Sequence, residues 1–323
     1  PAATTVSATS WSNFAKRAAS CEKRMRILIT GSNGLLGQNL SRLVPAGAEV
    51  MGVDLQERVA APGVEHFRRL DLGERKAVLA CVEEFAPEWI LNAAAWTNVN
   101  GAESARELCW RANVTAVENL ALACRKYRCR MVHLSTDYIF DGDHGPYREE
   151  DLPNPIGYYG KSKLASENVL RSSEIPCAVV RTMVLYGHAR QVKPDFISWL
   201  VSTLRQGKPV RIVTDQYGNT TLAEELARGI WRIVERQAQG FYHIAGTEII
   251  DRCSFALKAA EIFDLDAGLI TPITTAELNQ EAPRPMRSGL VVEKALRELE
   301  LELSDAAGGL RKLKQQLDAP TRA

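Results

Sequence analysis

The chain has 323 residues, of which 46% are hydrophobic and 24% are charged, as in an ordinary globular protein. Its 40 Lys and Arg residues nearly balance 39 Asp and Glu residues, which excludes the strongly charged surface typical of proteins that bind nucleic acid or anionic membranes. No apolar run approaches the roughly 18–20 residues that span a bilayer, so the sequence predicts a soluble, cytoplasmic protein.

Seven cysteines are scattered along the chain, and none forms a CxxC pair. Cys124 and Cys129 are the only two that lie close together, and no second Cys or His pair accompanies them. This pattern is typical of reduced thiols in the cytosol. We therefore predict no metal site.

Residues 1–24 differ from the rest of the chain in composition. They are rich in Ala, Ser and Thr, carry four basic residues and one acidic residue, and lack an apolar segment, which argues against a secretory signal. A transit peptide and a disordered extension ahead of a natural start at Met25 both fit this composition. The disordered extension is the preferred interpretation.

From Met25 onward, short apolar runs alternate with amphipathic stretches. The runs predict strands at 26–30, 49–54, 88–94, 130–135 and 177–182, and apolar residues at three- and four-residue steps predict a helix over 104–127. Strands joined by crossovers of this length indicate a doubly wound, Rossmann-type α/β fold, in which helices cover both faces of a parallel sheet. Ligands of such sheets bind beyond the carboxyl ends of the strands.

After about residue 187 the alternation loosens, which predicts a smaller C-terminal substrate lobe. Helices are expected near 194–206, after Asn219, and near 254–264 and 292–300, and strands are expected at 209–215 and 240–246. We assign 25–187 and about 216–247 to an NAD(P)-binding domain. The lobe then comprises 188–215 and 248–310, and residues 311–323 form a tail that begins with a short helix.

Three glycines, Gly31, Gly34 and Gly37, follow the first predicted strand and open a helix. The first permits a tight turn, the second lets a pyrophosphate approach the backbone, and the third lets the helix pack close to the sheet. The free N–H groups at the helix start then attract phosphates. This context predicts a dinucleotide site, whose contacts in the turn also include Asn33, Leu35 and Leu36.

Other residues at strand ends fit the same cofactor. Asp54 ends the second strand 23 residues after Gly31, where a carboxylate binds ribose hydroxyls and repels a 2′-phosphate. This slightly favours NADH over NADPH, although Arg58 nearby is compatible with NADPH. Two further sets of residues are expected to flank the cofactor. Asp71 and Leu72 would lie at the adenine, and the small residues Ala93, Ala94 and Ala95 would let the cofactor approach the backbone.

Two adjacent tyrosines raise the question of which one carries chemistry. Tyr159 and Lys163 stand four residues apart and share one helix face, whereas the same spacing pairs Tyr158 with the uncharged Ser162. The ammonium group, together with the positive ring of an oxidised nicotinamide, is expected to lower the pKa of the Tyr159 phenol from near 10. We therefore predict that Tyr159 is the acid–base residue.

These motifs together resemble an extended short-chain dehydrogenase/reductase. The segments "STDYIFDG" (135–142), "PYREEDLPNPIGYYGKSKLASE" (146–167), "VTDQYGNTT" (213–221) and "APRPMRSGL" (282–290) resemble the dTDP-4-dehydrorhamnose reductase family. The resemblance extends from about Met25 to Leu299. It implies reduction by NAD(P)H of the C4 ketone of a nucleotide-diphospho-6-deoxysugar, most simply dTDP-4-dehydro-L-rhamnose to dTDP-L-rhamnose.

The resemblance also implies roles for individual residues. Tyr159 would give a proton to the developing alkoxide, Thr136 would hydrogen-bond the carbonyl oxygen, and Lys163 would hold the nicotinamide ribose. Val184 would lie against the sugar. Asp137 would contact the sugar or form an Asx turn, and Arg284 and Arg287 would bind the substrate diphosphate or remain surface arginines. No metal is required for this chemistry, and some members of the family dimerise through the C-terminal lobe, which leaves a homodimer open.

Departures from the family pattern keep other functions open. Met183 and Val184 stand where the family commonly has a segment with Trp against the sugar, Thr220 replaces a usual Pro, and Asn100 replaces a usual Asp. A reductase or epimerase acting on another nucleotide sugar is one alternative. A non-catalytic, cofactor-binding regulatory subunit is the other, because the methionine adenosyltransferase β-subunit resembles the same family.

Overall fold

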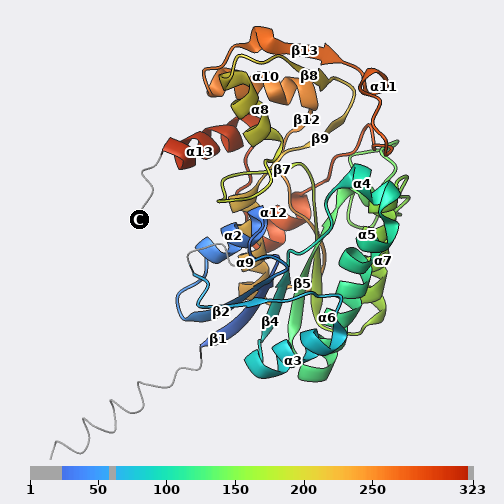
Figure 1. Cartoon of the computed structure of the whole chain (residues 1–323), viewed down its shortest axis with the longest axis vertical. Helices are drawn as coiled ribbons and strands as arrows, with labels where there is room; N and C mark the ends of the chain where they lie inside the picture. The colour runs from blue at the N-terminus through green and yellow to red at the C-terminus, as the bar shows by residue number, and fades with distance from the viewer. Residues whose placement is uncertain (1–23, 58–62, 319–323) are drawn as a thin grey trace, which may run out of the picture.

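The computed structural model describes residues 24–57 and 63–318. The extension predicted at 1–24, apart from Arg24, and the residue Arg58 lie outside the described residues. A seven-stranded sheet forms the centre of the structure, with every pair of neighbours parallel and the order β11-β6-β5-β4-β1-β2-β3 (Figure 1). Its strands are β1 (Met25–Thr30), β2 (Ala48–Asp54), β3 (His66–Arg69), β4 (Trp89–Asn92), β5 (Arg130–Thr136), β6 (Cys177–Thr182) and β11 (Gly240–His243). The predicted Rossmann-type fold is confirmed.

Alternate residues of β1 show why this sheet is buried on both faces. Ile27 and Ile29 point to one face, against α2 (Leu35–Arg42) and α9 (Ala223–Arg236). Leu28 points to the other face, against α3 (Arg75–Phe85), α6 (Ala116–Tyr127) and α7 (Tyr158–Ser172). Because successive side chains of a strand alternate between faces, a continuous apolar run fills both cores.

The single helix predicted over 104–127 is interrupted. The chain instead forms α4 (Val99–Ser104), α5 (Arg106–Trp110), a π-helical turn over Arg111–Thr115, and α6. Within the turn, Asn113 Oδ1 accepts a 2.8 Å hydrogen bond from the Trp96 N–H, and Asn113 Nδ2 donates one of 2.9 Å to Ser162 Oγ. Wider turns of this kind are frequent at functional sites. Here the turn joins the segment after β4 to helix α7.

The C-terminal lobe forms the upper part of the molecule in Figure 1 and has its own small core around Phe255, Leu200 and Leu310. Three two-stranded sheets support it: β8 (Val210–Val213) with β13 (Ile270–Ile273), β9 (Tyr217–Asn219) with β12 (Ile249–Asp251), and β7 (Leu185–Tyr186) with β10 (Thr221–Leu222). Its helical segments are α8 (Phe196–Arg205), α10 (Arg252–Ile262), a short turn at Ala267–Leu269, α11 (Thr275–Leu278) and α13 (Ala306–Asp318).

Two of the predicted domain assignments need correction. Helix α12 (Glu293–Leu299), which was assigned to the lobe, packs against α9 and β11 because Ala295 and Leu299 complete the core on that side of the central sheet. Residues 311–318, which were assigned to a tail, form much of α13, and Leu313 is 2% exposed in the core of the lobe. An amphipathic pattern identifies a helix, but it does not say which neighbour receives the apolar face.

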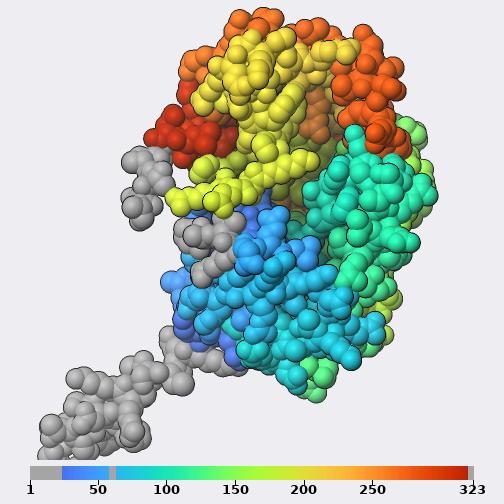
Figure 2. Space-filling view, in the orientation of Figure 1, coloured from blue at the N-terminus to red at the C-terminus, as the bar shows by residue number. Residues whose placement is uncertain are grey.

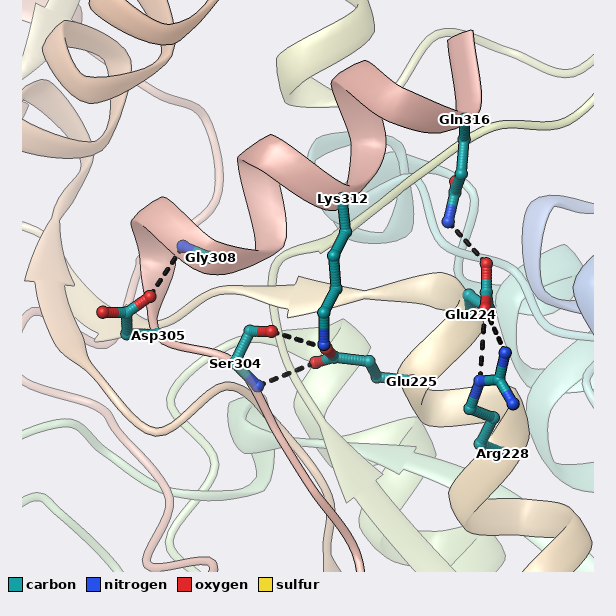
Figure 3. Close-up of polar contacts among 8 residues, drawn as sticks. All are labelled: Glu224, Glu225, Arg228, Ser304, Asp305, Gly308, Lys312 and Gln316. Atoms are coloured by element: carbon teal, nitrogen blue, oxygen red, sulfur yellow. Dashed lines mark hydrogen bonds and ion pairs between the residues drawn. The ribbon is translucent and has the colours of Figure 1, made fainter. Parts of the chain in front are cut away.

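The buried Glu225 carboxylate of α9 binds Lys312 of α13 and so connects the two helices (Figure 3). Glu225 is 6% exposed, and it accepts hydrogen bonds from Ser304 Oγ at 2.6 Å, from the Ser304 N–H at 3.0 Å and from Lys312 Nζ at 2.7 Å. Ionised groups make the stronger hydrogen bonds of proteins. The last described helix of the lobe is therefore tied to a helix that covers the central sheet. Over the described ranges, no helix has the length and apolar character needed to cross a membrane.

Candidate active site

A cavity of about 830 Å³ lies beyond the carboxyl ends of the central strands, where the fold class places ligands. Figure 2 shows the segment near residue 190 lying between the blue N-terminal half and the yellow C-terminal lobe, above this region. Gln38 Nε2 donates a 2.8 Å hydrogen bond to Arg190 O and holds that segment over α2. Every predicted site residue except Asn33 and Arg284 lines the cavity: Gly31, Gly34, Leu35, Leu36, Gly37, Asp54, Asp71, Leu72, Ala93, Ala94, Ala95, Thr136, Asp137, Tyr159, Lys163 and Val184.

The glycine turn fits a dinucleotide phosphate group. Gly31 has a φ of +65°, and a Cβ atom there would come within 2.8 Å of the Ala94 backbone. A Cβ atom on Gly37 would overlap the carbonyl of Gly31. Helix α2 begins after Gly34 with no side-chain cap, so its first N–H groups remain available to an anion. The residues present therefore suit the pyrophosphate of a nicotinamide cofactor.

The adenosine end of the cavity is formed by β2 and by residues from more distant segments. Asp54 Oδ2 accepts a 3.1 Å hydrogen bond from the Asn33 N–H, while the Asn33 side chain turns to Glu57 O at 2.8 Å. Asn33 thus holds the loop of Asp54 and does not line the cavity. Arg111, which the sequence analysis missed, lines the cavity and pairs with Asp71 at 2.7 Å. Because the two residues are 40 positions apart, no local sequence pattern indicates that they form a pair.

Tyr159 and Lys163 both project from α7 into the cavity wall, whereas Tyr158 does not line it. The guanidinium carbon of Arg106, the first residue of α5, lies 5.1 Å from the Tyr158 ring centroid. The Tyr159 ring meets the Tyr138 ring edge to face, with centroids 5.5 Å apart. The placement agrees with the choice of Tyr159, and its catalytic role stays a prediction.

The pKa of Tyr159 differs from what the sequence analysis expected. Enclosure in the cavity wall raises the pKa of its phenol well above the ordinary value, and the nearby Asp137 carboxylate raises it further. Hydrogen bonding with Thr136 acts in the opposite direction. The expected lowering by Lys163 does not occur with the protein groups alone, because the Lys163 ammonium is directed elsewhere.

Lys163 is held by the strand beneath it. Its Nζ donates a 2.6 Å hydrogen bond to Leu134 O and lies 3.4 Å from His133 Nε2. Burial lowers the pKa of Lys163 to about 8, although the Glu167 carboxylate acts against this shift. The amine is therefore close to its ionisation point at neutral to mildly alkaline pH.

A buried chain of hydrogen bonds crosses three strands to reach α7, and the sequence analysis did not detect it. Thr30 Oγ1 donates to Asn92 Oδ1 at 2.6 Å, and Asn92 Nδ2 lies 2.9 Å from His133 Nδ1. His133 Nε2 lies 3.0 Å from Ser166 Oγ, which itself donates to Lys163 O at 2.6 Å. Because Ser166 donates its hydroxyl proton to Lys163 O, it can only accept a hydrogen bond from His133. This assigns the proton of the neutral imidazole to Nε2. Burial lowers the pKa of His133 well below its ordinary value, which keeps the ring neutral.

Thr136 ends β5 and Asp137 begins the short turn after it, and both residues line the cavity. Asp137 is 2% exposed, and its two oxygens accept hydrogen bonds from Thr136 Oγ1 at 3.0 Å and from Ser288 Oγ at 2.9 Å. Burial raises the pKa of Asp137 to about 6, against the effect of these hydrogen bonds. Ser288 was not predicted, since it lies 151 positions away on the 282–290 segment.

The departures from the family pattern can be located. Val184 lines the cavity with a φ of +44°, and its carbonyl accepts the Thr221 N–H at 3.1 Å. Asn100 Oδ1 accepts a 2.7 Å hydrogen bond from Arg284, whose guanidinium also donates to Ala282 O at 2.9 Å. Arg284 Cζ lies 6.0 Å from the Tyr138 ring centroid. It borders the site without lining the cavity.

Residues 24–57 and 63–318 contain no group of three or more His, Cys, Asp or Glu side chains placed to hold a metal ion. The cavity is lined by the glycine turn, by Asp54 at the end of β2, and by Thr136, Tyr159 and Lys163.

Comparison with known proteins identifies the family. The family model described as "RmlD substrate binding domain" matches residues 25–318. The probable low-salt glycan biosynthesis reductase Agl14 of Haloferax volcanii is 33% identical over 280 residues, which cover 85% of this chain and 92% of that protein. Methionine adenosyltransferase 2 subunit beta of Xenopus laevis is 31% identical over 267 residues, covering 80% of this chain and 78% of that protein.

Solved structures agree with these relatives. The crystal structure of dTDP-4-dehydrorhamnose reductase from Bacillus anthracis in complex with NADP superposes with a TM-score of 0.82 at 27% identity, covering 91% of this chain and 99% of that one. The family resemblance stated from the sequence is confirmed, and so is the prediction of an NAD(P)H-dependent oxidoreductase. The chain belongs to the RmlD substrate binding domain family.

Proposed function

We propose that the protein reduces the C4 ketone of a nucleotide-diphospho-6-deoxysugar, with NADH or NADPH as the reductant. The observation that carries this proposal is the placement of Thr136, Tyr159 and Lys163 in the wall of the cavity that the glycine turn also lines. A phenol, a hydroxyl and an amine next to a dinucleotide cradle are suited to carbonyl reduction. A nicotinamide cofactor bound there would supply the hydride.

The side chains divide the remaining work. The Thr136 hydroxyl has one proton, which the Asp137 carboxylate accepts in this structure. We expect a bound substrate to redirect that proton to its carbonyl oxygen, where negative charge develops. Tyr159 is protonated at neutral pH because its pKa is raised, so it has a proton to give to that oxygen. The raised pKa opposes the transfer, but the alkoxide that forms on the substrate is a strong base and accepts the proton. Lys163 Nζ donates a hydrogen bond to Leu134 O and lies on the same helix face as Tyr159. We expect its ammonium to bind a ribose hydroxyl of the cofactor as well.

For the finer assignment we propose dTDP-4-dehydro-L-rhamnose as substrate and dTDP-L-rhamnose as product. The support is the B. anthracis relative, a dTDP-4-dehydrorhamnose reductase with 99% of its length covered. The side chain that distinguishes one sugar from another is Val184, which gives this part of the cavity a smaller wall than Trp would. A 4-keto sugar with a bulkier substituent is therefore the second substrate to test.

We propose NADH as the preferred reductant, because the Asp54 carboxylate lines the cavity at the expected position of the adenosine ribose. We further propose that the enzyme acts in the cytoplasm, where nucleotide sugars are made. A homodimer remains the proposed oligomer, and its test is the molar mass measured by light scattering.

A regulatory, non-catalytic function is the second candidate. It is favoured by the 31% identity to a methionine adenosyltransferase 2 subunit beta. Pull-down with a methionine adenosyltransferase catalytic subunit tests this candidate directly. Stable association without turnover of any 4-keto sugar would support it over the reductase.

The decisive assay for the proposed function follows the absorbance of the reduced cofactor. The full chain is mixed with dTDP-4-dehydro-L-rhamnose, which an upstream dehydratase and epimerase generate in the cuvette, and with NADH or NADPH in turn. We expect oxidation of the cofactor that depends on the sugar and is faster with NADH. A panel of other 4-keto nucleotide sugars then ranks kcat/KM values and identifies the substrate.

A further inference from the structure

A small recess of about 20 Å³ adjoins the main cavity next to the catalytic residues. Its lining shares Asp137, Tyr138 and Val184 with that cavity, and it also includes Arg252, the first residue of α10. The sequence analysis assigned no role to Arg252. Because Asp137 follows Thr136 directly, the recess lies close to the position proposed for the reacting carbonyl.

The guanidinium of Arg252 has no direct polar partner among the residues that the structure describes. Its backbone N–H donates to Gln216 O at 3.2 Å, and its Cζ lies 5.6 Å from the Phe196 ring centroid. Two carboxylates line the recess: Asp137 accepts hydrogen bonds on both oxygens, and Asp251 accepts one from the Ser254 N–H. Arg284, the other cation in this region, donates to Ala282 O and Asn100 Oδ1. Arg252 therefore keeps its donors available.

Arg252 is partly buried, so its guanidinium keeps only part of its contact with water and has no ion-pair partner within the described ranges to compensate. Burial lowers the pKa of Arg252, and the charges of Asp137 and Tyr138 counteract this only from beyond ion-pair distance. Removing a charge from water costs free energy unless a partner compensates. A planar guanidinium with five donors matches phosphate oxygens, which it binds in a bidentate manner. The missing partner is thus expected to be an anion that enters with a ligand.

We propose that Arg252 binds the phosphate group next to the sugar of a nucleoside-diphosphate sugar. This inference rests on the proposed function, and it names the residue that holds the anionic part of the substrate. In a hexose the C4 ketone and the phosphorylated C1 lie on opposite sides of the ring. A sugar whose ketone contacts Thr136 therefore places its first phosphate about one ring away from Thr136. The proposal requires that the sugar ring extends from Thr136 toward Arg252.

The alternative to phosphate binding is that Arg252 only balances the charge of Asp137 and contacts no ligand. The two roles make different demands on a binding experiment. A charge-balancing arginine affects the stability of the site as a whole, whereas a phosphate-binding arginine affects the nucleoside diphosphate and leaves the nicotinamide cofactor alone.

The test measures binding of dTDP, and of UDP in parallel, to the full chain saturated with NADP, by isothermal titration calorimetry. The variants are Arg252→Gln and Arg252→Lys, with Arg211→Gln as the matched control. Arg211 is an exposed arginine of the same lobe that lines neither cavity. We expect Arg252→Gln to weaken dTDP binding by about 10- to 100-fold, the usual effect of losing charge-assisted hydrogen bonds. Arg252→Lys should be intermediate, and Arg211→Gln should match the unmodified protein.

The other outcomes test the inference and the proposed function separately. Equal dTDP affinity in Arg252→Gln and the unmodified protein overturns the inference. So does a parallel loss of NADP and dTDP binding, which indicates a structural role for Arg252. Failure of the unmodified protein to bind either dTDP or UDP contradicts the nucleotide-sugar function itself. Binding that depends on Arg252, without turnover of any 4-keto sugar, supports the inference and counts against the reductase. If Arg252→Gln does not fold, the more conservative Arg252→Lys and its dTDP affinity decide the question.

Discussion

The hydroxyl of Thr136 donates a hydrogen bond of 3.0 Å to the carboxylate of Asp137, its neighbour in the chain. The same carboxylate accepts Ser288 Oγ from the far 282–290 segment, so it joins the end of β5 to a loop that closes the site. Burial raises its pKa to about 6. The group that organises the floor of the site is therefore costly to ionise.

Asp137 should make stability depend on pH between about 4 and 6. The folded pKa of about 6 lies above the unfolded value of 3.8, so its favourable contribution is complete below 3.8 and is lost as the pH rises through 6. We expect Asp137→Asn to gain stability over the unmodified protein as the pH rises from 4 to 7, by at most about 2–3 kcal/mol. Urea denaturation at several pH values measures the difference. The exposed Asp143→Asn serves as a control, and a difference that does not vary with pH would contradict this assignment.

Val184 should respond to substitution as a residue held in an unfavourable backbone conformation. Its φ of +44° lies in the region that β-branched residues rarely adopt. We expect Val184→Gly to be more stable than Val184→Ala by about 1 kcal/mol, because both lose the side chain but only alanine keeps the strain. Thermal or chemical denaturation measures both variants. At Met183, which is not among the residues of positive φ, the Gly variant should be the less stable of the two. The same order at both positions would refute the strain argument.

Asp54 should set the preference between the two cofactors. Its carboxylate lines the cavity and accepts the Asn33 N–H, so it faces the ribose position with a fixed negative charge. We expect Asp54→Ala to raise kcat/KM for NADPH relative to NADH by roughly 10-fold, since charge repulsion of a 2′-phosphate disappears. Glu57→Ala removes an exposed carboxylate paired with Arg69 and should leave the ratio unchanged. Equal use of both cofactors by the unmodified protein would remove the basis for the prediction.

Tyr159→Phe should abolish most of the turnover. Loss of a positioned general acid usually costs about 10²- to 10⁴-fold, and we expect kcat to fall by at least 10²-fold while NAD(P)H affinity is retained. Tyr158→Phe is the matched control, because the same atom is removed one residue away on a side chain that does not line the cavity. Steady-state kinetics and cofactor fluorescence give the two quantities. If Tyr158→Phe proved the more damaging change, the assignment would be wrong.

The sequence was sufficient wherever a local pattern has one structural solution. Apolar runs such as 26–30 fix the strands, and Gly31 occupies a left-handed turn that few other residues tolerate. Tyr159 and Lys163 are four residues apart on one helix, so their common face followed from spacing alone.

The parts that were missed depend on contacts between distant segments. His133 meets Asn92 across 41 positions and Ser166 across 33, and Ser288 reaches Asp137 across 151. None of these three pairings leaves a periodic trace in the sequence. Among the protein groups alone, enclosure by the cavity wall outweighs Lys163 and raises the pKa of Tyr159, and helix spacing gives no sign of that enclosure.

The central claim is that hydride passes to the sugar carbon whose oxygen Thr136 and Tyr159 contact. The most direct measurement supplies [4-²H]-labelled NADH of each stereochemistry with a dTDP-4-keto-6-deoxysugar and locates the deuterium in the product by NMR. The account predicts one deuterium at C4, delivered from one face of the cofactor only and lost in Tyr159→Phe. Deuterium at another carbon, or cofactor that stays fully reduced with every 4-keto sugar while binding normally, would contradict it.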